Sequence, residues 1–156
     1  MISDINSSPN TQIGAIVELY YSPIFDIVSI PKPNSDHQIT ESAIDFSVYG
    51  FKKLDILTDT AFLETEQNDS NQGDFFKSSI KATIASSQKK DLVVLKQLKR
   101  FLLKAKLGNG DLVLIGNKIE YCILAKNKSI PKKRSALQLD ELEFNIQHKD
   151  EFPSLV

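Results

Sequence analysis

Three glycines in the segment KAKLGNGDLVLIGNKIEYCIL, residues 104–124, are the first candidates for chemistry in this sequence. A Gly-x-Gly pair such as Gly108 and Gly110 can cradle a phosphate with backbone N–H groups. A dinucleotide-binding loop also needs a preceding strand, a third glycine three residues later and a following helix. The third position is occupied by Val113, inside an apolar, β-branched run that is typical of a strand. The pair is therefore interpreted as a turn and not as a phosphate site.

Two turns are predicted in this segment instead. Asn109-Gly110 stands between two apolar runs, which is the strongest short signal for a β-hairpin with a type I′ turn. Gly116-Asn117 predicts a second tight turn that leads into residues 119–126. The segment is therefore expected to form a small antiparallel meander.

The side chains that usually carry catalysis are sparse. His37 lies in a polar stretch and His148 at the end of a predicted strand, and neither has a second histidine or a cysteine at metal-ligand spacing. Cys122, the one cysteine, falls in a predicted strand, where a buried structural thiol is expected. Glu64 and Glu66 alternate along an extended run and are expected to decorate one exposed face. We therefore predict no catalytic residue, no metal site, no cofactor and no enzymatic activity.

Length and composition indicate a single domain of ordinary make-up. The 156 residues are 41% hydrophobic and 25% charged, which is usual for a globular protein with its own core. No apolar run approaches the roughly 20 residues of a membrane span, and the start MISDINSSPN lacks the basic and apolar regions of a signal peptide. We therefore expect no membrane partner.

The charge is unevenly distributed, although the net charge is only −1. The first 88 residues contain five basic and twelve acidic side chains, a balance of −7. Segregated charge suits self-association or nucleic-acid binding, but a solvated helix face with a flexible basic loop explains it equally well. The candidate basic patch, facing either an assembly contact or DNA, consists of Lys89, Lys90, Lys96, Lys99, Arg100, Lys126, Lys128, Lys132, Lys133 and Arg134.

The apolar pattern predicts a mainly β fold, either a β-sandwich or a curled antiparallel sheet, with one flanking helix at about residues 89–103. In that helix Leu92, Leu95, Leu98 and Leu102 form a stripe at helical spacing, which is expected to pack against the sheet. The domain organisation predicted is a flexible N-terminal arm at 1–12 and a single β-rich domain at 13–156, with long loops at 31–42, 67–74 and 126–135.

Three further strand predictions follow from the pattern of side chains. Two short strands are expected on either side of Pro23. Strict alternation over FFKSSIKATIA, residues 75–85, predicts the clearest strand. In the last strand the apolar residues change parity at Asp140-Glu141, which predicts a β-bulge there.

Several runs of this sequence resemble a known group of proteins. The runs FLETE, NQGDFFKSSIKATI, GNGDLVLIG and LQLDELEFNIQHKDEFP, in this order, resemble small virion proteins of tailed phages of the crAss-like and related Bacteroides-infecting kind. The resemblance covers about residues 60–156 and rests on turns and strand pattern. The sequence departs from the pattern at Gly108, where an acidic residue is expected, and residues 1–59 match nothing in it.

This resemblance implies a structural protein of the virion, assembled in the host bacterial cytoplasm. It implies a tail-tube-like fold and a closed ring, six- or twelve-fold, in the neck or tail between portal and tail. The implied partners are further copies of the chain, other neck, tail or portal proteins, and DNA that passes through the lumen. Ring closure fits heterologous contacts between identical subunits.

A second function remains open beside the ring subunit. A non-catalytic nucleic-acid-binding β-domain would contact backbone phosphates with the basic helix and the basic loop. Such a surface should carry aromatic residues among the basic ones for stacking on bases. The helix offers only Phe101, on or near its apolar stripe, and the loop offers none, which favours the ring subunit. A small enzyme with an unfamiliar site is the third and weakest alternative.

Overall fold

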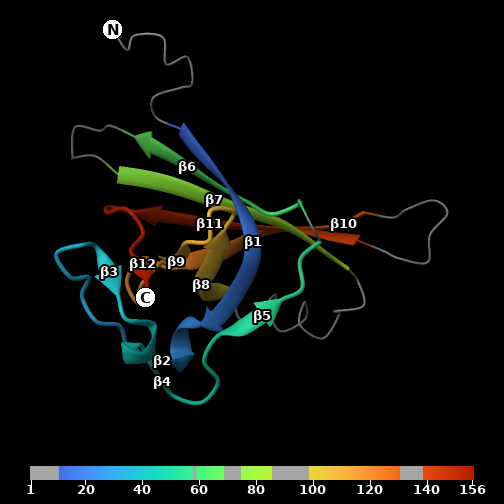
Figure 1. Ribbon diagram of the computed structural model, residues 1–156. Helices are drawn as coiled ribbons and strands as arrows, with labels where there is room; N and C mark the ends of the chain where they lie inside the picture. Colours follow the sequence, from blue (N-terminus) through green and yellow to red (C-terminus); the bar gives the residue numbers. More distant parts are fainter. Residues whose placement is uncertain (1–10, 58, 69–74, 86–98, 131–138) are drawn as a thin grey trace, which may run out of the picture.

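The chain folds mainly into β-strands (Figure 1). The computed structural model describes residues 11–57, 59–68, 75–85, 99–130 and 139–156. In chain order its elements are β1 (Thr11–Pro23), η1 (Ile24–Asp26), β2 (Ile27–Ser29), β3 (Gln38–Ile39), η2 (Glu41–Ala43), β4 (Asp45–Phe46), β5 (Lys52–Leu54), β6 (Phe62–Asn68), β7 (Phe75–Ala85), β8 (Arg100–Leu107), β9 (Leu112–Ile115), β10 (Cys122–Ile130), β11 (Leu139–His148) and β12 (Ser154–Leu155). In these ranges no helix is long and apolar enough to cross a membrane.

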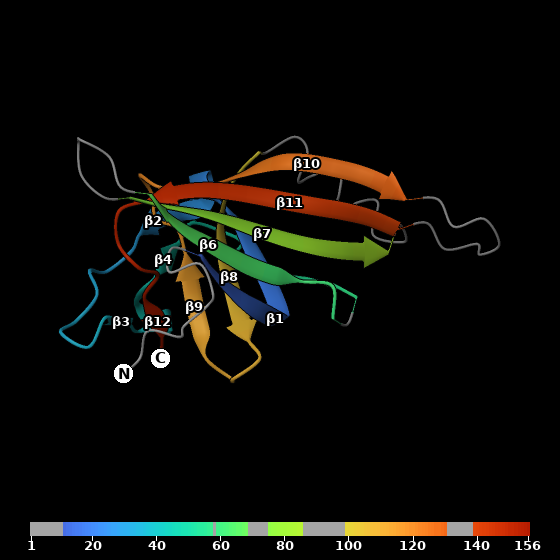
Figure 2. The same ribbon diagram turned by 90° about the horizontal axis from the view of Figure 1, so that it is seen from above.

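Six antiparallel strands close into a barrel. The order around it is β1-β6-β7-β11-β10-β8, and β8 pairs back onto β1. The neighbours β8-β1-β6-β7 have the strand order of a Greek key. Figure 2 shows β10, β11, β7 and β6 as one layer that crosses over β1, β8 and β9. Within this layer β7, β10 and β11 all extend beyond the barrel on the same side of it.

Strand β1 closes the barrel because it pairs with both β6 and β8, while Leu19–Tyr21 also pair with β5. Residues 11–15 pair with β6, and residues 16–23 pair with β8. The register with β8 shifts between Ile16 and Glu18, so Val17 is the extra residue of a β-bulge. A bulge bends its strand and increases the twist, which lets β1 pass from one partner to the other.

The barrel interior is a packed core. Each strand contributes inward side chains, and Phe101 of β8 contacts both Tyr21 of β1 and Phe144 of β11 edge to face, with ring centroids 6.0 and 5.7 Å apart. All three rings are buried. Edge-to-face aromatic contacts add stability beyond the area that they bury. The core therefore fixes the strands whose outer faces are described below.

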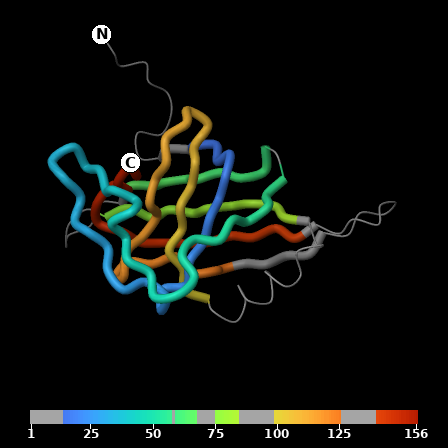
Figure 3. Tube along the Cα trace, turned by 60° about the horizontal axis from the view of Figure 1, so that its bottom comes forward, coloured from blue at the N-terminus to red at the C-terminus, as the bar shows by residue number. Residues whose placement is uncertain are grey.

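A second apolar cluster covers the outside of β8 and β9. Ile27, Ile39 and Leu155 pack there against Leu102 and Leu114. Figure 3 shows that residues 30–50 gather on this side of the barrel. The last strand β12 lies between β9 and β3, so the C-terminal residues belong to this layer.

A half-buried lysine attaches the same layer to the barrel. The ammonium of Lys104 on β8 pairs with Glu41 of η2 and lies over the rings of Tyr20 and Phe51, 4.2 and 5.0 Å from their centroids. The lysine side chain is only 12% exposed, so water screens these interactions weakly. Strand β8 is thus buried on one face by the barrel core and on the other by this layer.

This double burial explains the error in the predicted helix at 89–103. Residues 86–98 lie outside the described residues, so only the end of the prediction is tested. That end is wrong, because Arg100–Leu103 belong to β8. A strand buried on both faces carries a continuous apolar run, and such a run cannot be distinguished from a helix by periodicity.

Other predicted boundaries also change. The strand at 75–85, the break after Pro23 and the mainly β class are confirmed. Three segments predicted to lack regular structure, 1–12, 67–74 and 126–135, are shorter than expected. Residues 11–12 belong to β1, residues 67–68 to β6 and residues 126–130 to β10. The fourth, the 31–42 loop, contains β3. The remaining residues of the N-terminal arm and of the 67–74 and 126–135 loops lie outside the described part of the chain.

The bulge in the last strand is predicted in the wrong place. Strand β11 pairs with β7 without a break from Leu139 to His148, so Asp140 points inward and is buried. The shift lies instead in the partner strand β10, between Leu124 and Lys126. A buried aspartate at the inward position accounts for the apparent change of parity.

The turn at Asn109-Gly110 is confirmed as a hairpin, but it is not of type I′. Gly110 has a φ of 93°, whereas Asn109 is not among the residues with positive φ. The amide of Gly110 donates to Leu107 O at 2.9 Å, and that of Leu107 donates to Asp111 O at 2.8 Å. This is the pattern of a three-residue loop with a left-handed glycine at its end. The Gly116-Asn117 turn is confirmed, with the amide of Asn117 2.7 Å from Glu120 O.

The two turn glycines make a matched pair for a stability test. Both have positive φ, but a Cβ on Gly110 would meet nothing within 4 Å, while one on Gly116 would lie 2.9 Å from Glu120 O. We expect Gly110→Ala to lower the free energy of unfolding by about 1–2 kcal/mol through backbone strain. Gly116→Ala should lower it by about 1–3 kcal/mol more, because the turn must also shift. Urea unfolding of both variants measures the difference, and equal losses would contradict it.

Candidate functional site

A hydrogen-bonded serine–histidine pair is the arrangement closest to catalytic chemistry in the described residues. Ser78 Oγ lies 2.8 Å from His148 Nε2, and His148 Nδ1 lies 2.7 Å from the carbonyl oxygen of Asp150. A carbonyl only accepts, so Nδ1 of the neutral imidazole carries the proton and Nε2 accepts from the Ser78 hydroxyl. Thr65 Oγ1, 2.9 Å from Ser78 Oγ, then donates to the serine. A nucleophile with a correctly oriented base would look like this.

Burial argues that this relay is structural. Ser78 and His148 are only 2% and 4% exposed. The imidazole is stacked between Phe76 and Phe152, with ring centroids 5.3 and 4.1 Å away. A serine hydroxyl that is this buried, beside a histidine enclosed by two rings, is poorly placed to meet a substrate carbonyl. The relay instead connects β6, β7 and the end of β11 to the C-terminal residues.

The sequence contained a signal for this pair. His148 has the parity of Phe144 and Ile146 along β11, and Ser78 has the parity of Ile80 along β7. Both therefore had to point into the core, where a polar side chain needs a partner. The alternation of side chains does not tell which residues of β7 and β11 lie opposite each other. The pairing of His148 with Phe76, which brings His148 near Ser78, could therefore not be predicted.

The other two candidate side chains are also held by the backbone. His37 Nε2 donates to the carbonyl oxygen of Glu151 at 2.7 Å. Cys122 is fully buried, as predicted, and burial raises the pKa of its thiol well above the usual range. A thiol that stays protonated is a poor nucleophile and metal ligand. Among the described residues no three His, Cys, Asp or Glu side chains are grouped so that they could hold a metal ion.

A buried carboxylate organises the chain where β1 ends. Asp26 is 1% exposed, and its two carboxylate oxygens accept hydrogen bonds from the amides of Val48, Tyr49 and Gly50 at 2.9–3.1 Å. Burial by itself would raise the pKa of Asp26, but these three donors outweigh it and hold the pKa below its usual range. Asp26 thus fixes the segment 47–50 against η1.

Four exposed apolar side chains stand on the two segments that Asp26 joins. Phe25 and Val28 are 67% and 52% exposed, and Val48 and Tyr49 are 74% and 73% exposed. We call these four residues the Asp26 surface. Single exposed apolar residues are ordinary, but four of them on two segments that are fixed to each other make a candidate interaction site.

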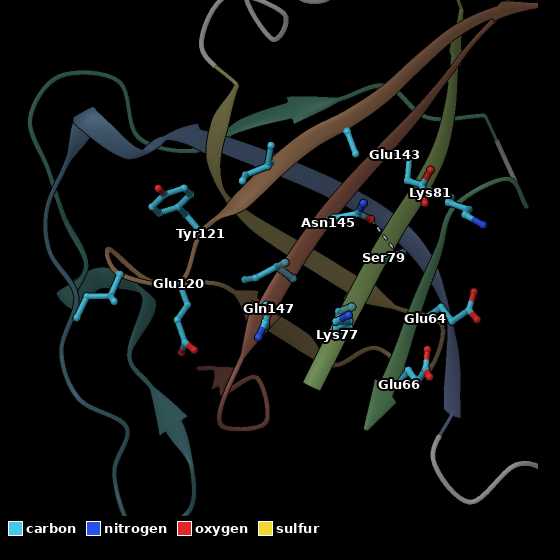
Figure 4. A pocket seen from close by; sticks show the side chains of 15 residues that line it. Glu64, Glu66, Lys77, Ser79, Lys81, Glu120, Tyr121, Glu143, Asn145 and Gln147 are labelled. Atoms are coloured by element: carbon cyan, nitrogen blue, oxygen red, sulfur yellow. Dashed lines mark hydrogen bonds between the residues drawn. The ribbon is translucent and has the colours of Figure 1, made fainter. Parts of the chain in front are cut away.

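An open groove of about 790 Å³ lies on the outer face of β6, β7, β11 and β10 (Figure 4). Glu64 and Glu66 share this face, as predicted. They stand in cross-strand rows, with Glu64 opposite Ser79 and Glu66 opposite Lys77. We call this groove, with its wall of Ile119, Glu120, Tyr121 and Ile123, the outer groove.

The predicted basic patch is only partly described. Lys99 and Arg100 are exposed, and the Arg100 guanidinium lies over the ring of Tyr121, 5.3 Å from its centroid. Arg100 is opposite Ile123 on β10, so the start of β8 lies beside the strand that carries Lys126 and Lys128. The other members, Lys89, Lys90, Lys96, Lys132, Lys133 and Arg134, lie outside the described residues.

Comparison with known proteins gives no match. No protein-family model, no curated protein and no solved structure matches the chain. The function is therefore argued from the geometry above.

The buried histidine should make stability depend on pH. Desolvation lowers the pKa of His148 in the folded state, whereas the hydrogen bond to Asp150 and the charges of Glu120 and Asp150 oppose the shift. Below the ordinary value of 6.5 the unfolded chain therefore takes up a proton more readily than the folded chain. The contribution of neutral His148 to the free energy of unfolding is therefore present above that pH and is lost as the pH falls.

We expect His148→Gln to remove this part of the pH dependence. Urea midpoints of wild type and variant should run parallel above about pH 7.5, and the wild type should fall more steeply between about pH 7 and 5. The variant is less stable throughout, so the comparison is of slopes. Identical slopes would show that His148 keeps an ordinary pKa in the folded protein.

Proposed function

We propose that the chain is a non-catalytic structural subunit that self-associates into a ring, in the neck or tail of a tailed phage between portal and tail. The observation that carries this proposal is the Asp26 surface. Its four apolar side chains face solvent in the isolated chain, yet the backbone of two of them, Val48 and Tyr49, is held by a buried, hydrogen-bonded carboxylate. This combination suits a preformed contact surface.

The energetics of Asp26 support that interpretation. Burying a carboxylate is unfavourable unless hydrogen bonds replace its hydration. Asp26 meets this demand with the amides of one short segment, and the result is a fixed position for Val48 and Tyr49. A rigid aromatic side chain loses little entropy on binding, which is why tyrosine is frequent in interface centres.

The sheet edges favour contact through side chains over strand addition. The barrel is closed, and β3 and β5, the two end strands in the sheet order, have two and three residues. Short edge strands protect a protein from edge-to-edge pairing. Subunits therefore meet through surfaces such as the Asp26 surface, and a contact of this heterologous kind closes into a ring when the rotation allows.

The resemblance to small virion proteins supplies the biological setting of the proposal. A tail-tube-like subunit would use a β-domain for ring contacts and leave a lumen through which DNA passes. The barrel with its added strands is compatible with that role. A six- or twelve-fold ring, in contact with portal or other neck and tail proteins, is the assembly proposed.

Light scattering of the purified chain tests the proposal. Wild type should form a discrete closed oligomer at low and high salt. Val28→Asp with Val48→Asp should reduce it to monomer, because the two carboxylates would be buried in the contact. Phe62→Asp with Val156→Asp is the control, since these apolar residues are also exposed, at 42% and 63%, and lie outside the Asp26 surface.

Two results would contradict the proposal. The first is a wild-type monomer at every concentration and salt, and the second is equal assembly of the two double variants. A monomer would turn attention to DNA binding, where Lys96→Glu, Lys99→Glu and Arg100→Glu should weaken retention on a DNA column and flatten its salt dependence.

A further inference from the structure

The outer groove is acidic and has two chemically different sides. Glu64, Glu66, Glu120 and Glu143 line it, against Lys77 and Lys81. Four acids and two bases leave a net charge of −2. Ile119 and Ile123 line the wall together with Tyr121 and are 88% and 48% exposed. The floor, on β6, β7 and β11, thus carries three carboxylates and two ammonium groups, and the wall carries Glu120 beside apolar side chains.

The floor offers hydrogen-bonding groups to an elongated ligand. Asn145 and Gln147 lie on β11 within the groove, and the Ser79 hydroxyl donates to Asn145 Oδ1 at 3.0 Å. In Figure 4 the side chains of Gln147, Lys77 and Glu66 follow one another across three strands. Rows of polar side chains across strands suit an extended peptide more than a compact small molecule.

The chain itself contains a segment with the complementary chemistry. Residues 131–138 read PKKRSALQ, with three adjacent cations, no acid and then Ala136 and Leu137. Cations would meet the carboxylates of the floor, and the apolar pair would meet the wall. Opposite charges of this kind set the register and the specificity of an interface. We call residues 131–138 the basic segment.

Chain connectivity prevents this segment from reaching far into the groove of its own copy. Ile130 and Leu139 pair at the end of the β10–β11 hairpin, and nine Cα steps separate them. The connecting backbone can therefore extend no more than about 16 Å from that pair, whatever its conformation. Gln147 lies eight residues along β11, about 26 Å away, and Glu66 is two strands further across, in the row of Lys77.

We infer that the outer groove binds the basic segment of a second copy of this chain. The inference rests on the proposed self-association and names one of its contacts. Strands β10 and β11, which flank the segment in the sequence, run past the barrel in Figure 2, so the described ends of the two strands stand clear of it. Each copy inserts its basic segment into the outer groove of one neighbour and binds the basic segment of another neighbour in its own groove. Such a contact is heterologous.

A peptide-binding experiment tests this contact separately from ring formation. The receptor is the full chain with Lys132→Glu, Lys133→Glu and Arg134→Glu, whose own segment is thereby disabled. The probe is a fluorescein-labelled peptide of residues 129–138, SIPKKRSALQ, followed by anisotropy. We expect saturable binding that weakens as salt is raised.

Charge reversal in the receptor locates the binding site. Glu64→Lys with Glu66→Lys should weaken peptide binding by about tenfold or more and should restore binding of a peptide with the three cations replaced by glutamate. Asp45→Lys with Glu151→Lys changes the net charge equally, at exposed residues outside the groove, and should leave binding within about twofold.

The possible results separate the two proposals. Equal binding by groove and control variants, or no binding, would overturn the groove contact even if wild type forms a ring. Binding that depends on Glu64 and Glu66 would support it even if the wild-type chain fails to close into a ring. If dilute wild-type monomer excludes the peptide while the disabled receptor binds it, the segment occupies its own groove and the inference is wrong.

Discussion

The pairing of β1 with two partners is the constraint on which the rest of the structure depends. Its first half completes the sheet with β6, and its second half joins β8. The bulge at Val17 lies between the two pairings and bends β1 at that point. The end of β1 also delivers Asp26 to its place, so closure of the barrel and presentation of the Asp26 surface are coupled.

Two buried polar groups extend the order of the barrel into its surroundings. Asp26 binds a segment more than twenty residues away in sequence, and His148 binds Ser78 on the neighbouring strand β7 and Asp150 in the C-terminal residues. In each case the hydrogen bonds replace hydration that burial removes. Both groups are of types that often act in catalysis, yet they are buried, and their hydrogen bonds hold one segment of the chain against another.

Local patterns in the sequence predicted local features, and the failures lie where tertiary contacts decide. The alternation of apolar and polar residues was sufficient to predict the strand at 75–85. The Asn-Gly and Gly-Asn pairs were sufficient to predict that both turns exist. The end of the predicted helix failed because Leu102 faces a second apolar layer that the pattern could not reveal. The bulge was misplaced because Asp140 is a buried polar residue at a core position. The Asp26 surface was missed, since an isolated aspartate in sequence gives no sign of the amides that it will bind.

The closure of β1 onto β8 also has a consequence for the kinetics of folding. Ile16 pairs with Leu107, so the closing contact joins residues that are about ninety positions apart. Such a contact must overcome the entropy of a long loop before it contributes stability, and folding slows as contact order rises. During synthesis β1 waits until β8 has left the ribosome, and until then both strands expose unpaired edges. The open barrel is thus the species most prone to aggregation, and the acidic first half of the chain reduces that hazard through its own repulsion.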